Sequence, residues 1–263
     1  MTSISSIEIF CLSDSPLEEF LVGKNIPFNR FNLSDKKLII DVILNLQFDI
    51  LISNGCPFII PVSKLKKRHQ KFINIHPTFL PFLRGATPIN GVFYDEMNFF
   101  GATMHYMDDG VDTGRIIFQK KISLTQDVDL PMLYYMSFRL ESEVFEEGFI
   151  NHIIDQQPLE DLEAKELGSY FNRTEDKLTI NILEDSDQVI SRKIKSFGMS
   201  HLGCLLSLKN IKLKVFNGTI IKNKKFISWF KDKTPGSILL ELDESIYIKT
   251  KDSILRIEKF KKI

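Results

Sequence analysis

Asn74 and His76 are the first residues whose types and spacing could do chemistry. They lie in the mostly apolar run at residues 72–76, which predicts a β-strand. Side chains alternate along a strand, so both would point to the same side. An amide and an imidazole directed into one pocket can hold a carbonyl oxygen and move a proton. A histidine at a strand end is, however, more often a hydrogen-bonded structural residue than a catalyst.

A second polar segment, at residues 105–114, reads HYMDDGVDTG and ends another predicted strand. A carboxylate in this acidic, glycine-containing loop could orient His76 or accept its proton, as in other carboxylate–imidazole pairs. An acidic loop is usually only a solvated turn, and the EF-hand spacing for calcium is not met. Between the two segments lies a loop at residues 80–88 that contains one arginine, Arg84.

The first half of the chain must position these residues, and it alternates strand and helix patterns. Strands are predicted at residues 7–12, 26–28, 49–53 and 72–76, and helices at 16–23, 38–46 and 88–94. Residues 99–107 and 116–122 could pair as a hairpin, and residues 130–155 form a long amphipathic helix. Alternating strands and helices indicate a parallel sheet, whose ligands collect at the carboxyl ends of the strands. That rule indicates residues 53–56 and 74–76.

The second half is different, with a linker pattern at residues 156–158 and short β-rich runs from residue 211. These runs, at 211–216, 218–221, 237–242, 245–250 and 253–257, are separated by turn residues and predict a small barrel or a curled sheet. We therefore expect an α/β fold: a Rossmann-like, mostly parallel twisted sheet with flanking helices, plus a small β-rich, OB-like domain. The expected boundaries are a catalytic domain at 1–157, a connecting helical or linker region at 158–208, and the β-barrel-like domain at 209–263.

The composition bounds the function classes. Hydrophobic residues are 43% and charged residues 26% of the 263 positions, which excludes disorder as the main state. The 34 Lys and Arg balance 34 Asp and Glu, so no net field favours a generic nucleic-acid binder. The three cysteines show no metal or disulfide spacing. Neither a signal peptide nor an 18-residue apolar stretch is visible, so a cytoplasmic protein without a membrane partner is expected.

The two polar segments together resemble the folate-dependent formyltransferase family. Residues 74–88 read NIHPTFLPFLRGATP and residues 101–116 read GATMHYMDDGVDTGRI. The family signature is N-x-H-P-(S/T)-x-L-P-x-x-R-G-x-x-P, followed after a strand by G-x-T-x-H-x-M-x-x-x-x-D-x-G-x-I. Residues 53–61 look like the family's folate-pocket segment, and residues 235–238 resemble the start of its last C-terminal strands. The chain opens at what resembles the family's second strand, so we expect its first β-α unit to be absent or reduced.

This resemblance implies formyl transfer from N10-formyltetrahydrofolate, without a metal, to an amine. Asn74, His76 and Asp112 match the family's catalytic trio. Asn74 and protonated His76 would stabilise the oxyanion that develops, while Asp112 would orient His76. Either Asp112 or His76 could be the base that removes the proton of the amine. His105, on the strand before the loop, would support these groups rather than react.

The resemblance also implies two binding surfaces. The pterin would lie against two segments, one before and one after the catalytic strand: Phe58, Ile59, Ile60, Met107, Asp108, Asp109, Gly110 and Val111. The acceptor would contact the Arg-Gly loop and an aromatic–Arg segment: Arg84, Gly85, Tyr170 and Arg173. Arg84 could instead be a loop anchor, and aromatic residues more often pack in a core.

Several acceptors fit the resemblance. The preferred one is a nucleotide-linked amino (dideoxy) sugar, used for surface glycans, because the Arg-Gly loop and the neutral charge suit a small molecule. The alternative is methionyl-tRNA, whose polyanionic acceptor would need basic patches. A glycinamide ribonucleotide formyltransferase, a formyltetrahydrofolate hydrolase and a scaffold protein without activity are less favoured. The exposed β-rich C-terminal strands make a homodimer plausible.

Overall fold

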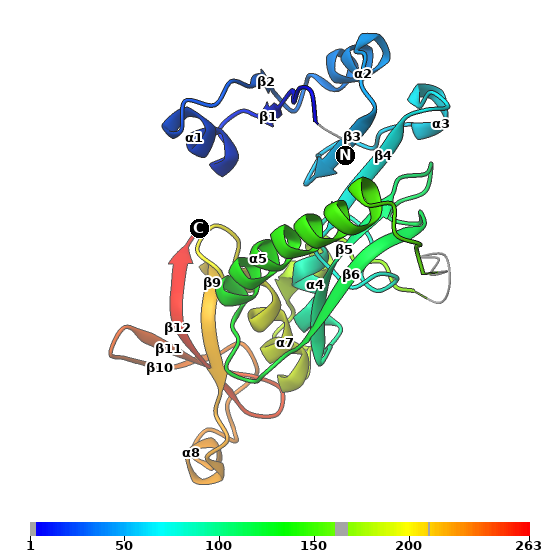
Figure 1. Ribbon diagram of the computed structural model, residues 1–263. Coiled ribbons are helices and arrows are strands. Elements are labelled where there is room, and N and C mark those ends of the chain that lie inside the picture. Colours follow the sequence, from blue (N-terminus) through cyan, green and yellow to red (C-terminus); the bar gives the residue numbers. More distant parts are fainter. Residues whose placement is uncertain (1–3, 161–167, 210) are drawn as a thin grey trace.

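The computed structural model describes residues 4–160, 168–209 and 211–263. These residues contain three sheets: a parallel pair, a four-stranded sheet and a six-stranded sheet (Figure 1). The expected α/β class with a β-rich C-terminal domain is confirmed. Within these ranges no helix is long and apolar enough to cross a bilayer.

The N-terminal pair consists of β1 (Phe10–Leu12) and β2 (Asn29–Phe31), joined by helix α1 (Pro16–Gly23). Helix α1 begins as predicted, because the Ser15 side chain accepts a hydrogen bond from the Glu18 N–H at 3.2 Å. The predicted strand at residues 26–28 is wrong by three positions. Pro27 has no N–H for a ladder, whereas the N–H of Asn29 donates to the Ile9 carbonyl at 2.7 Å.

The four-stranded sheet carries the predicted chemistry, in the order β3-β4-β5-β6. Its strands are β3 (Ile50–Asn54), β4 (Lys71–His76), β5 (Phe99–Tyr106) and β6 (Ile116–Ser123). β3 and β4 run parallel, while β4–β5 and β5–β6 are antiparallel pairs. The expected hairpin of β5 and β6 is therefore present. Helix α2 (Lys36–Asn45) leads into β3, and the short helices α3 (Val62–Leu65) and α4 (Pro88–Tyr94) flank β4.

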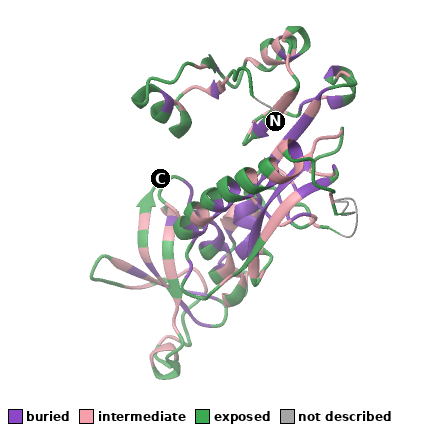
Figure 2. Cartoon of the chain, viewed as in Figure 1, coloured by how far each residue is buried: buried purple, intermediate pink, exposed green. Residues whose placement is uncertain are grey.

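Helix α5 (Leu130–Gly148) crosses this sheet and continues as a π-helical turn at Phe149–Ile154. Its buried residues Leu133, Leu140 and Val144 share one core cluster with Ile73 and Met104 of the sheet. Figure 2 shows buried residues concentrated beneath α5 and along β4 and β5, whereas the N-terminal pair and its helix are mostly exposed or intermediate. The core therefore lies directly under the strand that carries Asn74 and His76.

The C-terminal sheet has the order β10-β11-β12-β9-β8-β7, and its end strands do not pair with each other among the described residues. Its strands are β7 (Thr179–Ile180), β8 (Cys204–Leu208), β9 (Ile211–Ile220), β10 (Ile238–Leu242), β11 (Ser245–Lys249) and β12 (Ile254–Lys262). Helix α7 (Asp187–Phe197) packs on this sheet, and α6 (Glu175–Leu178) and α8 (Lys224–Ser228) are short.

Two expectations about this half need correction. β7 and β8 belong to the C-terminal sheet, so the domain boundary expected at residue 209 falls inside this sheet. Residues 161–167 of the expected connector lie outside the described residues. The predicted turn at 217–218 is also wrong, because β9 runs through it as one strand. A Cβ at Gly218 would lie 2.9 Å from the Arg256 carbonyl, so this glycine allows close strand pairing.

Candidate active site

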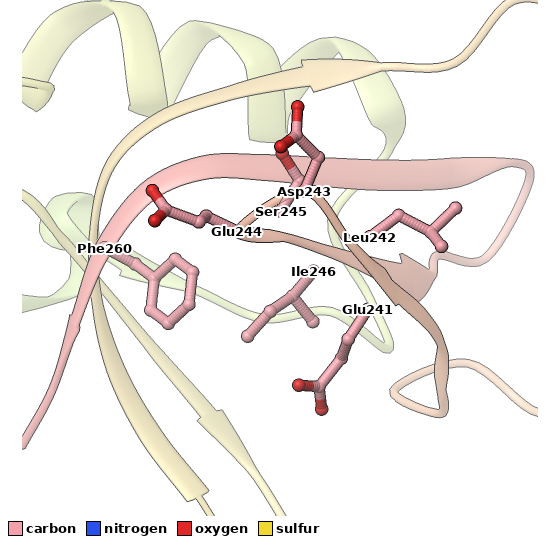
Figure 3. Close-up of a pocket in the computed structure, with 7 residues that line it drawn as sticks. All are labelled: Glu241, Leu242, Asp243, Glu244, Ser245, Ile246 and Phe260. Carbon is pink, nitrogen blue, oxygen red and sulfur yellow. The ribbon is translucent and has the colours of Figure 1, made fainter.

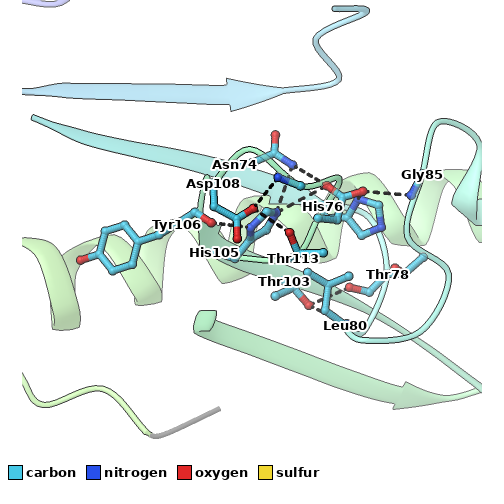
Figure 4. Close-up of polar contacts among 12 residues, drawn as sticks. Asn74, His76, Thr78, Leu80, Gly85, Thr103, His105, Tyr106, Asp108 and Thr113 are labelled. Carbon is cyan, nitrogen blue, oxygen red and sulfur yellow. Dashed lines mark hydrogen bonds and ion pairs between the residues drawn. The ribbon is translucent and has the colours of Figure 1, made fainter. Parts of the chain in front are cut away.

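Asn74 and His76 lie at the carboxyl end of β4, an interior strand of the four-stranded sheet. Asn74 pairs with Ser53 on one side and with His105 on the other. His76 is buried, with 3% of its surface exposed. The alternation of side chains places both residues on one side of the strand, where the same carboxylate contacts them (Figure 4). The predicted juxtaposition is therefore present.

Asp112 is the carboxylate that joins these residues. It lies in the loop after β5 with a left-handed φ of 53°. Its Oδ2 lies 3.5 Å from His76 Nδ1 and accepts the Gly85 N–H at 2.9 Å. Its Oδ1 lies 3.4 Å from Asn74 Nδ2 and 3.6 Å from His105 Nε2. One carboxyl group thus contacts four groups from three segments of the chain.

The environment keeps Asp112 ionised. Burial by itself would raise the pKa of its carboxyl. The contacts with His105, His76 and the Gly85 N–H outweigh burial and lower the pKa of Asp112 to about 2. A group with this pKa is an anion near neutral pH, and it is a weak proton acceptor.

The His76 ring is held at both nitrogens. Its Nε2–H donates to the carbonyl of Leu83 at 3.0 Å, so in the neutral ring the lone pair is at Nδ1, which faces Asp112. Burial is the main cause that lowers the pKa of His76, against the opposing effects of Asp112 and the Leu83 carbonyl. The lowered pKa favours the neutral imidazole in the resting site. The Leu83 carbonyl was not anticipated, because a backbone group has no signature in residue types.

His105 orients the other side of the site. Its Nδ1 donates to the Tyr106 carbonyl at 2.8 Å, and its Nε2 lies 3.6 Å from Asp112 Oδ1. Asn74 Nδ2 lies 3.3 Å from that nitrogen. The two contacts of the Asn74 amide, to His105 and to Asp112, are both long, so its N–H groups are only weakly held. They remain available to a ligand oxygen.

The two segments predicted to bind the pterin are brought together. Asp109 accepts the Ser63 N–H at 3.0 Å, which ties the loop after β5 to the start of α3. Ile60 is buried in a small cluster against which Met107 packs. The other predicted residues divide as follows: Phe58 and Asp108 are half-buried, and Ile59, Asp109, Gly110 and Val111 are exposed. Exposed Ile59 and Val111 are apolar surface that a flat ring could cover.

Asp108 has a structural position in that loop. Its Oδ1 accepts the Gly110 N–H at 3.0 Å and the Thr113 hydroxyl at 2.6 Å (Figure 4). Gly114 closes the loop, since a Cβ at this position would lie 1.8 Å from the Tyr106 carbonyl. These contacts fix the backbone that carries Asp112.

The residues predicted to contact the acceptor also meet. Arg84 and Tyr170 form an isolated parallel bridge, and the guanidinium lies 5.2 Å from the centroid of the Tyr170 ring. The Arg84 side chain is buried, whereas 54% of Tyr170 is exposed. The N–H of Arg173 donates to the Thr87 hydroxyl at 2.8 Å. Residues 169–173 therefore run beside the Arg-Gly loop, whose Gly85 contacts Asp112.

A separate pocket lies in the C-terminal sheet, far along the chain from these residues. Figure 3 shows the residues that line it, at the β10–β11 turn and on β12: Glu241, Leu242, Asp243, Glu244, Ser245, Ile246 and Phe260. It contains none of the groups described above. Among the described residues no cluster of His, Cys, Asp and Glu could hold a metal ion.

Comparison with known families identifies the architecture around this site. Residues 18–147 match the family described as "Formyl transferase", and residues 173–263 match "Formyl transferase, C-terminal domain". The chain belongs to the formyl transferase family. Members of this family are enzymes that transfer formyl groups, so the family expected from the two polar segments is confirmed.

Curated formyl transferases from several bacteria resemble this chain. A methionyl-tRNA formyltransferase from Clostridioides difficile is 31% identical over 136 residues, which cover 52% of this chain and 44% of that protein. A methionyl-tRNA formyltransferase from Staphylococcus epidermidis is 27% identical over 244 residues, which cover 91% of this chain and 74% of that protein.

Two solved structures share the fold. HypX from Aquifex aeolicus, solved in complex with tetrahydrofolic acid, gives a TM-score of 0.68 at 16% identity, over 97% of this chain and 44% of that chain. An N-formyltransferase from Helicobacter canadensis was solved with folinic acid and dTDP-3-aminofucose. It gives a TM-score of 0.62 at 20% identity, over 93% of this chain and 82% of that chain.

Proposed function

We propose that this protein transfers a formyl group from N10-formyltetrahydrofolate to a primary amine, and that Asn74, His76 and Asp112 carry the reaction. The observation on which this depends is that the Asp112 carboxyl contacts both Asn74 and His76, and its pKa of about 2 favours the anion. An amide donor, a neutral imidazole and a fixed anion are the groups that acyl transfer to nitrogen requires. Tetrahydrofolate and folinic acid in the solved relatives support a folate donor.

The pKa directions favour His76 over Asp112 as the base. Asp112 has a pKa of about 2, so it accepts a proton poorly, whereas the lowered pKa of His76 keeps the ring neutral and ready to accept one. The amine nitrogen attacks the formyl carbon, and its proton passes to His76. Asp112 stabilises the imidazolium. The carbon–N10 bond then breaks, and the imidazolium returns the proton to N10, which leaves as tetrahydrofolate.

Asn74 supplies the donor for the oxyanion in this scheme. The tetrahedral intermediate places negative charge on the former formyl oxygen, and N–H groups directed at that oxygen stabilise it. The long contacts of the Asn74 amide can be exchanged for a shorter, charge-assisted bond to that oxygen. The Ile59, Ile60 and Val111 surface beside it suits the pterin, since its flat ring needs apolar cover and backbone partners.

For the acceptor we propose a nucleotide-linked amino sugar. The half-exposed Tyr170 ring, held over Arg84 beside the site, is suited to stack on a base or sugar face. The similarity to the Helicobacter canadensis relative solved with dTDP-3-aminofucose covers 93% of this chain and 82% of that chain. Both observations support a small acceptor that reaches Asp112 past the Arg-Gly loop. A cytoplasmic location and a homodimer remain predictions.

Methionyl-tRNA is the second candidate, and one feature of the chain favours it. Residues 209–263 contain 14 Lys and Arg against 6 Asp and Glu, an excess of eight positive charges. The neutral total conceals this asymmetry, so overall neutrality is no argument against a polyanionic acceptor. Curated relatives at 27–31% identity are methionyl-tRNA formyltransferases.

A formylation assay separates the two acceptors. The purified protein is given N10-formyltetrahydrofolate with dTDP-, UDP- or GDP-linked amino sugars, or with methionyl-tRNA, and the formylated products are quantified. We expect a product with an amino sugar and salt-insensitive rates. A product with methionyl-tRNA alone, at rates that fall steeply with salt, would overturn the sugar proposal and leave the catalytic trio intact. No formyl transfer to either acceptor would count against the trio itself.

A further inference from the structure

The connection between β9 and β10 leaves the C-terminal sheet and returns to it. At its start, the N–H of Ile221 donates to the Ile254 carbonyl at 2.9 Å, and at its end the N–H of Gly236 donates to the Lys249 carbonyl at 2.8 Å. Between these two contacts, residues 222–235 carry the short helix α8, and we call them the α8 segment. Figure 1 shows α8, in orange, at an extremity of the molecule beyond the strands of the C-terminal sheet. The segment is therefore a protrusion.

Local hydrogen bonds hold this protrusion in one conformation. The Asn223 side chain caps α8, because its oxygen accepts the Phe226 N–H at 3.0 Å. The N–H of Ile227 donates to the Asn223 carbonyl at 3.0 Å, and the N–H of Phe230 donates to the Ile227 carbonyl at 3.1 Å. The α8 segment therefore presents its side chains from a defined backbone.

An aromatic cluster lies on the α8 segment. The centroid of the Phe226 ring lies 5.9 Å from that of Trp229, 5.4 Å from that of Phe230 and 6.0 Å from that of Tyr247 on β11. Trp229 is 65% exposed, and none of residues 222–234 is buried. Exposed apolar surface that is rimmed by polar residues marks sites of interaction with proteins or membranes.

The same segment is strongly basic. Residues 222–233 contain five lysines and one aspartate, in a chain whose net charge is zero. All five lysines are exposed: Lys222, Lys224, Lys225, Lys231 and Lys233. Within the described residues none of them forms an ion pair. Unpaired positive charge around an exposed indole favours an anionic partner that also offers apolar contact.

We propose that the α8 segment docks on a phospholipid membrane surface with anionic headgroups. Tryptophan is enriched at the level of the headgroups, because its ring is apolar and its N–H is polar. Each lysine close to an anionic leaflet strengthens binding about fivefold. A protruding tip also reaches a flat surface without obstruction by the rest of the molecule. The shape, the charge and the exposed Trp229 of the segment therefore all match this partner.

A nucleic acid matches the segment less well. Proteins that bind single strands combine a basic groove with several exposed ring faces on which bases stack. Here the lysines lie on a protrusion, and Trp229 is the only exposed ring of the four in the cluster. A second copy of the chain would have to offer an acidic, partly apolar hollow. The pocket in Figure 3 has this character, so self-association is one outcome of the test.

Contact with a membrane surface differs from insertion. The expected lack of a membrane partner depends on the absence of an apolar spanning stretch, whereas a segment that lies on the surface needs none. The cytoplasmic leaflet carries anionic lipids, so this contact is compatible with the predicted cytoplasmic location. The α8 segment lies outside residues 53–173, which hold the candidate active site. The inference therefore does not depend on the proposed function.

Trp229 is the single tryptophan of the chain, so its fluorescence reports directly on the α8 segment. The full chain is mixed with vesicles of phosphatidylcholine that contain about one-third phosphatidylglycerol, an anionic lipid, or with vesicles of phosphatidylcholine alone. With the anionic vesicles only, we expect the emission to shift to shorter wavelength and its quenching by iodide to fall severalfold. Added salt should reverse both changes, because it screens exposed charges.

Two lysine pairs test the contribution of charge by co-sedimentation with the anionic vesicles. Lys224→Gln/Lys225→Gln removes the charges of the first two residues of α8 and should weaken binding about tenfold or more. The matched control, Lys36→Gln/Lys37→Gln, removes two exposed charges from the first two residues of α2 and should leave binding unchanged.

Two aromatic variants test the contribution of the indole in the same assay. Trp229→Ala should weaken co-sedimentation, whereas Tyr135→Ala, which removes an exposed ring on α5, should not. The proposal is overturned if anionic vesicles leave the emission unchanged, if neutral vesicles shift it equally, or if the control variants lose binding to the same extent. Quenching by a single-stranded RNA oligonucleotide without any effect of vesicles would replace the membrane with a nucleic acid. An emission shift that follows protein concentration alone would replace it with a second copy of the chain.

Discussion

The carbonyl oxygen of Leu83 lies 3.0 Å from Nε2 of His76 and accepts a hydrogen bond from its N–H. This backbone contact, together with burial, decides how the site can work. It directs Nδ1 toward Asp112, and burial lowers the pKa of the ring, which favours its basic form. The Leu83 residue has a left-handed φ of 57°, so the loop that offers this carbonyl is specifically shaped.

Replacement of His76 tests the assigned base. We expect His76→Ala to lower kcat by about 10²–10⁴-fold, the usual contribution of general acid–base catalysis, while the protein stays folded. Because the pKa of His76 is lowered from its ordinary value of 6.5, the neutral, basic ring persists at pH values below 6.5. The acid limb of the kcat/KM profile should therefore lie below pH 6.5. A pH–rate profile of the wild-type protein measures it. A limb clearly above pH 6.5, or near-normal turnover of His76→Ala, would refute the assignment.

Asp112 should matter for both turnover and stability. Its pKa in the folded state, about 2, lies below the ordinary 3.8, so ionisation stabilises the fold above the ordinary value. That stability is lost as the pH falls from about 4 to about 2, and it amounts to about 2 kcal/mol. Asp112→Asn should lose most of the turnover and flatten this acid-induced loss in urea unfolding. An unchanged pH dependence of stability in the variant would contradict the charge assigned to Asp112.

Glu141 should respond to pH in the opposite sense. Burial is the main cause that raises its pKa to about 7 from 4.5, against the Asn54 hydrogen bond. Ionisation therefore opposes folding, and stability falls as the pH rises through 5 to 8. Glu141→Gln, which copies the neutral acid, should stabilise the protein by about 1–3 kcal/mol at pH 8 and change little at pH 4. Thermal melts at both pH values measure this. A loss of stability at pH 8 would show that the charged form is the native one.

Gly114 should tolerate no side chain. A Cβ there would lie 1.8 Å from the Tyr106 carbonyl. The Tyr106 backbone would therefore have to move, and this would shift the loop that carries Asp112. We expect Gly114→Ala to cost about 2 kcal/mol or more and to reduce turnover. The matched control is Gly23→Ala, at the end of α1, where a Cβ meets nothing within 4 Å. Urea unfolding should show the control at or above wild-type stability; equal effects of the two substitutions would count against this packing.

Tyr170 should act on acceptor binding. Its exposed ring over Arg84 lies beside the site but does not reach Asp112. Tyr170→Ala should raise the KM for the amino sugar about tenfold, the loss of one stacking contact, with little change in kcat. Tyr135→Ala, which removes an exposed ring on α5, is the control and should change neither constant. A fall in kcat at constant KM would place Tyr170 in the chemistry instead.

Much of the site could be predicted from residue types and spacing. The alternation in residues 72–76 placed Asn74 and His76 on one side of a strand, and the acidic loop supplied the third group. The alternation of strands and helices predicted the sheet that holds them. Predictions failed where a backbone group decided the outcome. The proline at 27 displaced β2, and the close approach of Arg256 to Gly218 let β9 continue through an expected turn.

The sequence by itself determined which groups could react, since amide, imidazole and carboxylate are properties of residue types. Only the tertiary structure decided their charge states, because the pKa values of His76 and Asp112 depend on burial and on partners from distant segments. It also decided which nitrogen of His76 donates a hydrogen bond, through the Leu83 carbonyl, a backbone group that residue types do not predict. Likewise, the exposure of Trp229 is a property of the tertiary structure, because the residue type by itself predicts burial.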